Sequence, residues 1–543
     1  MSAKFAQIVE ETIRGIWERH PVTATFMGIH DYDDRLGDIT PEGHAADLAA
    51  MRGDVERLRA VATSDLSDLE ATDQRLLACE LEADIRTSEE LRPLDRYPQA
   101  PLDIALFGPF LLLIREFAPL EERMASLLAR TEAVPGLLEV ARSNLRTGEN
   151  IPAVWVSVAE EVAEGGAEFW GETVPEWAEQ TPALREQVLA AASRANEAFA
   201  DYVRFLREEL RPRAEGDFAI GRELFDFLLE THHMLPYDAD ELHEFGSGLV
   251  ADTRRRMDEL AEQMDRGKSW HEIVAELKQD HPSAEGVLEA YRTEMARARD
   301  FVREHDLVSV PPGEELEVVE TPPFERATTP YAAYVSPAPF EAQQKGFFWV
   351  TPVDESAPAE RREDQLKGHC NWGLPVVSLH EGYPGHHLQL CHANRVDSLV
   401  RKQFGTSVFA EGWALYCEEM MYESGFYTDP RTRLFQLKDV LWRACRVVID
   451  VGLHTRGMGF DEAVNMLVDM AGLERTNAIK EVQRYTASPT QPMSYAMGKR
   501  EILRLREDYE RAKAGAFCLK EFHDELLSFG TIPVALVRSH MLP

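Results

Sequence analysis

The sequence has few cysteines and a marked shortage of basic residues. Its six cysteines among 543 residues include no Cys-x-x-Cys pair, which is typical of free thiols in a reducing compartment rather than of a disulfide framework. Lys and Arg number 58 against 95 Asp and Glu, so the formal net charge is −37. Because phosphate backbones and anionic lipids would be repelled by such a surface, we expect neither nucleic acid nor a membrane as a partner.

Long apolar runs are also missing. No stretch approaches the roughly 20 residues that span a bilayer, and the first residues have no apolar core of the kind that signal peptides carry. The sequence therefore predicts a cytoplasmic protein. It also has no Gly-x-Ser-x-Gly motif, no phosphate-binding glycine loop with Lys-Ser/Thr and no dinucleotide fingerprint, which excludes the common enzyme classes that depend on them.

What the chain does contain is a cluster of metal-binding residue types. The eight residues 380–387 read His-Glu-Gly-Tyr-Pro-Gly-His-His, and Ala-Glu-Gly-Trp follows at 410–413. A His-Glu pair, another His and a later Glu are the groups with which gluzincin-type sites hold Zn²⁺ and activate water. We expect His380, His386 and Glu411 to bind the metal and Glu381 to act as the general base.

The spacing of the histidines departs from His-Glu-x-x-His, in which both imidazoles lie on one helix face. The residue four positions after His380 is Pro384, and on a straight helix neither later histidine could share an ion with His380. Pro384 and Gly385 provide the means to break the helix. If two residues bulge out, His386 is the second ligand, and if three do, His387 is. We favour His386, with His387 as the alternative ligand or as a partner that orients one.

The third ligand also has alternatives. Glu418 and Glu419 follow Glu411 by about two helical turns, although two successive acids on a helix more often form a solvated face. Two histidines and a glutamate favour one Zn²⁺ per chain, while Mn, Co and Fe accept the same ligands.

Three residues outside these motifs are candidates for contact with the substrate or the reacting atoms. Tyr495 begins a helix and could donate to a tetrahedral oxyanion, or it could simply cap the core. Lys499 lies one turn later on the same face and is a candidate for substrate binding. Tyr334 could face the substrate or pack internally.

The segment 439–457 carries a polar stripe on an otherwise apolar helix. Arg443, Arg446, Asp450 and His454 recur every three or four residues, which indicates a buried network or the wall of a cleft. Either arginine could bind a substrate carboxylate through two parallel hydrogen bonds, and His454 could donate to the reaction intermediate. Arg–Asp pairing that holds helices together is the structural alternative.

Hydrophobic periodicity predicts helices from the start of the chain to about residue 305. The region 306–352 predicts a small antiparallel sheet with strands at 307–310, 316–320 and 347–350, whose edge could pair with an extended substrate. Helices return after 360. We therefore predict a mainly α protein with a helical region 1–305 that forms one wall of a cleft and a catalytic region 306–543, the two joined in one continuous fold.

The sequence resembles the bacterial DUF885 family, whose signature His-Glu-x-x-Pro-Gly-His-His matches residues 380–387. The resemblance extends nearly end to end, through residues 21–30, 347–350, 410–416, 443–454 and 491–499. That family is grouped with zincin-like metallopeptidases and is similar in architecture to M32-type carboxypeptidases. The resemblance implies a large zincin-like helical fold around a cleft, with the small sheet next to the metal-binding helix.

The leading functional hypothesis is a zinc-dependent hydrolase of peptide or amide bonds, with carboxypeptidase-like action on short peptides if an arginine faces the cleft. One alternative is a metal-dependent hydrolase of a non-peptide amide or amino-acid conjugate. Another is a non-catalytic binding protein on the same fold. The sequence leaves the oligomeric state open, a homodimer being one option.

Overall fold

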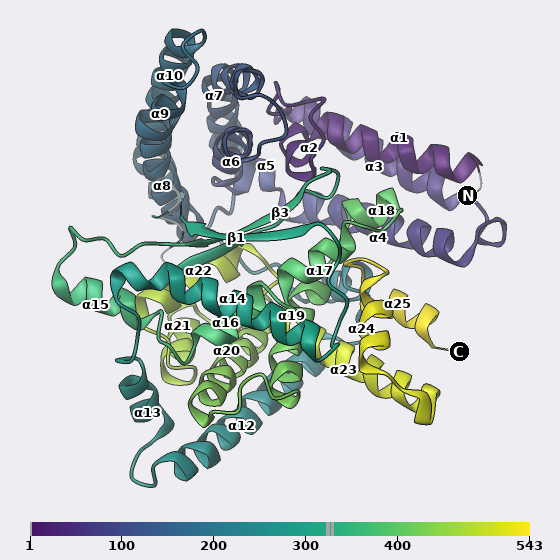
Figure 1. Ribbon diagram of the computed structural model, residues 1–543. Coiled ribbons are helices and arrows are strands. Elements are labelled where there is room, and N and C mark those ends of the chain that lie inside the picture. Colours follow the sequence, from purple (N-terminus) through teal and green to yellow (C-terminus); the bar gives the residue numbers. More distant parts are fainter. Residues whose placement is uncertain (1–2, 322–325, 327–328, 330, 543) are drawn as a thin grey trace. The chain divides into compact units, whose positions relative to one another are not determined.

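The computed structural model of the protein describes residues 3–321, 326, 329 and 331–542 (Figure 1). Contacts divide the chain into two compact units. The first comprises Met1–Phe218, Ala338–Glu341 and Ser398–Gln403, and the second comprises Ala219–Pro337, Ala342–Asp397 and Phe404–Pro543. The change in composition along the sequence predicts a division near residue 305. The two units of the structure divide near residue 218 instead, because helices between 222 and 304 contact the C-terminal helices.

The described residues of the first unit form helices joined by loops, without a strand. The expected periodicity is present there, since Leu76, Leu77 and Leu81 are buried on one face of a helix, as are Val188 and Phe199 on another. Its helices are α1 (Ala3–Arg19), α2 (Pro21–Met27), α3 (Pro41–Arg59), α4 (Asp68–Leu91), α5 (Pro93–Arg96), α6 (Ala100–Ile114), α7 (Leu120–Thr147), α8 (Ala153–Glu168), α9 (Val174–Ala178), α10 (Arg185–Phe205) and α18 (Leu399–Gln403).

No single helix among the described residues has the length and apolar composition needed to cross a bilayer. The segments Asp68–Arg96 and Ala100–Ile114 meet that test only as a pair, and they are bent by 89° relative to each other.

The second unit contains every candidate site residue. Its helices are α11 (Arg222–Phe227), α12 (Ala239–Met264), α13 (Trp270–Leu277), α14 (Val287–Glu304), α15 (Ala359–Lys367), α16 (Leu374–Glu381), α17 (His386–Ala393), α19 (Ser407–Glu423), α20 (Pro430–Thr455), α21 (Phe460–Asp469), α22 (Arg475–Ala487), α23 (Ser494–Lys513), α24 (Leu519–Leu527) and α25 (Val534–Met541). The prediction of a mainly helical protein is confirmed.

One small sheet interrupts the helices of this unit. Its strands are β1 (Glu314–Glu320), β2 (Ala332–Val335) and β3 (Gln344–Val350), in the order β1-β3-β2. Strand β1 pairs with β3 in parallel and β2 pairs with β3 antiparallel. Helix α14 runs beside β1 (Figure 1), and apolar side chains of α14, the sheet and the start of α16 form one buried cluster. The sheet thereby supports the first helix of the histidine motif.

Two details of the predicted sheet are wrong. The sheet is mixed rather than antiparallel. Residues 307–310 form no strand, although Leu307 and Val308 are buried. The backbone there bonds to side chains of α24 instead of a neighbouring strand, since Leu307 O lies 2.7 Å from His523 Nδ1 and Ser309 N donates to Asp524.

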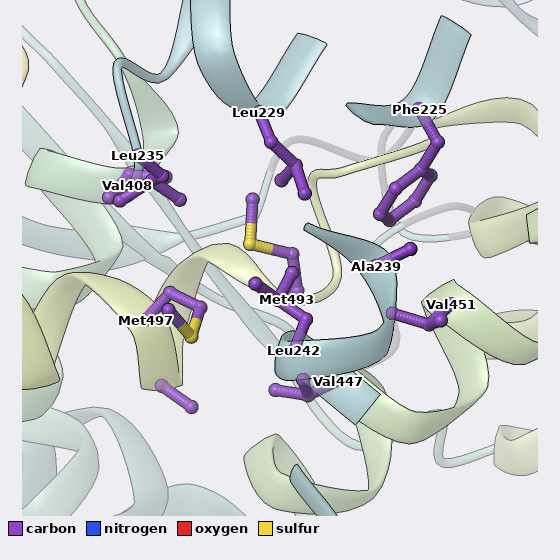
Figure 2. Close-up of a cluster of buried hydrophobic side chains, with 11 residues drawn as sticks. Phe225, Leu229, Leu235, Ala239, Leu242, Val408, Val447, Val451, Met493 and Met497 are labelled. Atoms are coloured by element: carbon purple, nitrogen blue, oxygen red, sulfur yellow. The ribbon is translucent and has the colours of Figure 1, made fainter. Parts of the chain in front are cut away.

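A second apolar cluster connects the helices that carry the site. Figure 2 shows Phe225 and Leu229, Leu242 from α12, Val447 from α20 and Met493 beside the start of α23 meeting in one core. These residues are buried, and removing such area from water is worth roughly 25 cal/mol per Å². The cluster therefore holds α20 and α23 in a fixed relation, with Arg446 and Tyr495 as immediate sequence neighbours of core residues.

Helices α19 and α23 approach unusually closely because two glycines face each other. A Cβ at Gly412 would lie 2.4 Å from the Cα of Gly498, and a Cβ at Gly498 would lie 1.8 Å from the carbonyl oxygen of Val408. Any side chain at either position would force the two backbones apart. The glycine of the Ala-Glu-Gly-Trp motif is therefore a packing requirement that brings Glu411 and Tyr495 onto neighbouring helices.

We expect Gly498→Ala to destabilise the protein by about 1–3 kcal/mol, because overpacking costs that much where backbone must move. The matched control is Gly248→Ala in α12, where no atom lies within 4 Å of the added Cβ and where alanine should stabilise the helix by about 0.5–1 kcal/mol. Urea unfolding of both variants measures the difference. Equal stability of the two variants would contradict the close packing of α19 and α23.

Candidate metal centre

The histidine motif is split between two helices. Helix α16 ends at Glu381 and α17 begins at His386, so Pro384 and Gly385 lie in the break that the sequence predicts. A Cβ at Gly385 would be 1.8 Å from the carbonyl oxygen of His380, and only glycine fits there. The indole of Trp413 donates to Pro384 O at 2.8 Å. The break is thus held from α19, two residues beyond Glu411.

The break brings together three side chains that could hold a metal ion. His380, His386 and Glu411 each offer one ligand atom, and these atoms lie within 4.8 Å of one another. His386 Nε2 is 3.2 Å and His380 Nε2 is 3.9 Å from the same oxygen, Oε2 of Glu411. That oxygen is buried and accepts no hydrogen bond from the described residues. Two imidazole nitrogens around an unsatisfied carboxylate oxygen are a donor set that suits Zn²⁺.

A second carboxylate fixes the orientation of His380. Oε1 of Glu418, which lies two turns after Glu411 on α19, is 2.8 Å from Nδ1 of His380. This contact occupies one ring nitrogen and leaves Nε2 for the cluster, as carboxylates do behind metal-bound histidines. Glu418 is 1 % exposed, and burial raises its pKa to about 7. Glu418 therefore lies behind His380 rather than among the three grouped donors.

The protonation of His386 is coupled to the charge of Glu411. Burial lowers the pKa of His380 to about 4. Burial alone would also lower the pKa of His386, but the carboxylate of Glu411 outweighs it and raises this pKa to about 9. Burial opposes ionisation of Glu411, yet His386 lowers its pKa to about 2. A bound cation would take the place of the proton that His386 carries next to the Glu411 carboxylate.

Glu381 lies beside the cluster with its carboxylate free. It is the last residue of α16 and is partly exposed, and no hydrogen bond or ion pair joins it to another described residue. Its charge nevertheless acts on both His380 and His386. A carboxylate next to a candidate ligand, with no bond to the other residues that the structure describes, is available to take a proton from water.

The ring of Tyr495 lies parallel to the ring of His380. The two rings stack at 6.3 Å between centroids with 15° between their planes. The hydroxyl has no hydrogen-bond partner among the described residues. Burial, followed by the charge of Glu411, raises the pKa of Tyr495, so that the hydroxyl keeps its proton. This geometry fits a hydrogen-bond donor near the reacting atoms.

His387 points away from the three grouped donors. It is fully buried, with Nε2 2.9 Å from Glu314 Oε2 and Nδ1 3.1 Å from the hydroxyl of Tyr334. Arg299 pairs with the other oxygen of Glu314. His387 therefore joins strands β1 and β2 to α17, and Tyr334 is held by it rather than being free in the site.

Two other candidates are occupied elsewhere. Lys499 Nζ lies 3.4 Å from a carboxylate oxygen of Glu419, and the other oxygen of Glu419 pairs with Arg433 at 2.6 Å. The charge of Lys499 is therefore paired within the protein. His454 is 1 % exposed and lies 3.0 Å from the carbonyl oxygen of Tyr485 through Nε2. Eight residues separate His454 from Arg446, about 12 Å along α20. The structure does not bring His454 to the cluster.

Sequence reasoning did not identify Glu314, and it considered Glu418 only as a ligand. Glu314 lies 69 positions before Tyr383, whose hydroxyl donates to it, and no local spacing links the two. Glu418 could have been found, because residues seven apart on a helix share a face and α19 was expected to present Glu411 to a histidine.

Comparisons with known proteins define the relatives of the chain. The profile of the family described as "Bacterial protein of unknown function (DUF885)" matches residues 21–541. No functionally curated protein matches the chain. A solved structure of a "putative lipoprotein of unknown function" from Shewanella oneidensis is 25% identical, covers 100% of both chains and has a TM-score of 0.82. Another, of a "putative lipoprotein" from Colwellia psychrerythraea, is 21% identical, covers 100% of this chain and 99% of its own, and has a TM-score of 0.86.

These relatives overturn the predicted cytoplasmic location. Both solved structures are described as lipoproteins, a class named for its lipid anchor, and anchoring is a route to the membrane surface that needs no spanning helix. The expectation rested on apolar runs and cysteine spacing, which report on spanning helices and disulfides and not on lipid attachment.

Proposed function

The chain belongs to the DUF885 family of bacterial proteins of unknown function, and we propose that it is a zinc-dependent hydrolase of peptide or amide bonds. The observation that carries this proposal is the convergence of His380, His386 and Glu411, with the free carboxylate of Glu381 beside them. A zincin-like fold is part of the proposal, since two ligands would come from a broken helix and the third from the helix packed on it.

The donor set supports zinc as the cofactor. Two imidazoles and one carboxylate are a known zinc-binding combination that leaves a position open for water or substrate, and Glu418 supplies the usual carboxylate behind a ligand histidine. Bound zinc would lower the pKa of a water molecule to about 7 and polarise the substrate carbonyl. His380, His386 and Glu411 are the residues that would hold it.

The remaining chemistry belongs to side chains of this protein. The carboxylate of Glu381 accepts a proton from the attacking water. It then passes this proton to the amine nitrogen as the C–N bond breaks. The water oxygen forms the new bond to the acyl carbon. The hydroxyl of Tyr495, without a partner among the described residues, donates a hydrogen bond to the oxygen that becomes negative. The contact between His387 and Glu314 ties α17, which carries His386, to strand β1.

Metal content and metal-dependent hydrolysis test the proposal. We expect about one zinc per chain by elemental analysis, loss of hydrolysis after chelation, and recovery when zinc is returned. A panel of short peptides, N-acyl amino acids and non-peptide amides separates the peptide substrate from an amide metabolite. Protein that neither retains nor takes up any metal would contradict the proposal and favour a binding protein.

A further inference from the structure

Arg446 carries a buried charge that no carboxylate of the described residues contacts directly. Glu481 and Glu411 act on this charge only from a distance, and the guanidinium lies over the rings of Trp442, Tyr485 and Tyr495. The residue is 2 % exposed, and no carboxylate of the described residues lies within 4 Å of its guanidinium. Its Nε is buried without a hydrogen-bond partner, and Nη2 makes only a long bond of 3.3 Å to Gln491. Gln491 Oε1 also accepts from Arg484 at 2.8 Å. Buried charges are normally paired, so this guanidinium indicates a missing anion.

Arg443 lies beside Arg446 and is only loosely paired. Its Nη1 is 3.5 Å from Asp439, too distant for a good hydrogen bond, and its Nε and Nη1 are both without hydrogen-bond partners. The side chain is 12% exposed, so it reaches solvent where Arg446 does not. Two adjacent guanidiniums with unsatisfied donors are suited to hold one carboxylate.

The aromatic ring of Tyr495 contacts both arginines and also His380 of the metal cluster. The guanidinium carbons of Arg446 and Arg443 lie 4.1 and 5.5 Å from the ring centre of Tyr495, and the same ring stacks on His380 at 6.3 Å. Two consecutive ring contacts therefore separate the positive charges from the metal-binding histidine. One or two residues of extended chain, each about 3.5 Å long, cover such a span once a contact of about 3 Å is added at each end.

We propose that Arg443 and Arg446 form a subsite for the free carboxylate of the residue or dipeptide that leaves as the amine. The substrates would then be peptides and N-acyl amino acids cleaved near their carboxyl end. This inference rests on the proposed hydrolase and specifies the substrate class of the same site. Cleavage adds water across the C–N bond, so the released amine keeps the carboxylate that the arginines bind.

Paired substrates that differ only at the carboxylate test the subsite. We expect the zinc-loaded protein to hydrolyse N-benzyloxycarbonyl-Ala-Phe about 100-fold faster, as kcat/KM, than its C-terminal amide, since hydrogen bonds to charged groups are worth about that factor. Arg443→Gln and Arg446→Gln should each lose most of this preference. Arg484→Gln is the matched control: Arg484 shares Gln491 with Arg446 but is ion-paired with Glu481 and exposed. It should keep the preference.

Binding of N-acetyl-L-phenylalanine and its amide, measured by calorimetry, provides a readout independent of catalysis. We expect the acid to bind and the amide not to, with the difference lost in Arg446→Gln. Acid-selective binding that depends on Arg446, in a protein that hydrolyses nothing, would support the subsite and reject the hydrolase. Hydrolysis and binding that ignore the carboxylate would reject the subsite and leave the hydrolase intact.

The thermal midpoint separates this role from a structural one. Because no carboxylate of the described residues lies within 4 Å of Arg446, Arg446→Gln breaks no ion pair and loses only the ring contacts of the guanidinium. Its midpoint should therefore stay within a few degrees, roughly, of the wild-type midpoint. A midpoint clearly below the wild type, together with unchanged preference for the carboxylate, would show that Arg446 only holds helices together and would overturn the proposal.

Discussion

Glu381→Gln should lower the rate of hydrolysis by about 10²–10⁴-fold while the protein keeps its metal. General base catalysis contributes a factor of that size, and glutamine has nearly the shape of glutamate but cannot accept the proton. Glu381 makes no hydrogen bond or ion pair with other described residues, so the substitution breaks no contact. Turnover of a peptide substrate and zinc content, measured on the same preparation, test both halves of the prediction.

The control for this variant is Glu423→Gln, which makes the same chemical change at the exposed end of α19. Its turnover should match that of the wild type. Full activity of Glu381→Gln would rule out Glu381 as the base. Loss of activity together with loss of zinc would instead assign Glu381 to metal binding.

Glu411→Ala should weaken zinc binding far more than Glu418→Gln. Glu411 presents an unsatisfied oxygen to both His380 and His386, so its loss removes one of three donors. Glu418 contacts only the far nitrogen of His380, and substitutions at such outer positions cost about 10–100-fold in metal affinity. Competition with a zinc chelator of known affinity measures all variants on one scale.

His387→Gln is the comparison that separates the two histidines of the motif. His387 is engaged by Glu314 and Tyr334, so we expect zinc binding close to that of the wild type. If Glu418→Gln weakened zinc binding more than Glu411→Ala, the third ligand would have to be reassigned to Glu418. Loss of zinc in His387→Gln would move the second ligand from His386 to His387.

The local part of the site could be predicted from the sequence because it depends on short-range geometry. Pro384 disrupts helical backbone bonding and Gly385 fits where no side chain can. These restrictions act within a few residues, so the break between His380 and His386 could be anticipated. The alternation of apolar and charged residues at helical spacing predicted the mainly helical fold in the same way.

The partners of these residues could not be predicted, because they come from distant parts of the chain. Glu314 reaches His387 from a strand 73 positions away, and Glu418 reaches His380 across 38 positions. The order β1-β3-β2 likewise depends on pairing energies between strands rather than on any one strand.

The sequence by itself determined which residue types are available for metal chemistry and where the backbone between two of them must break. Only the tertiary structure decided that His386 rather than His387 joins His380 and Glu411, and that Lys499 and His454 are occupied elsewhere. It also decided that no carboxylate of the described residues lies within 4 Å of the Arg446 guanidinium. The reason is physical: backbone restrictions are local, whereas whether a charge is paired depends on which helices pack together, and that is set by the shared apolar core and the contact between Gly412 and Gly498.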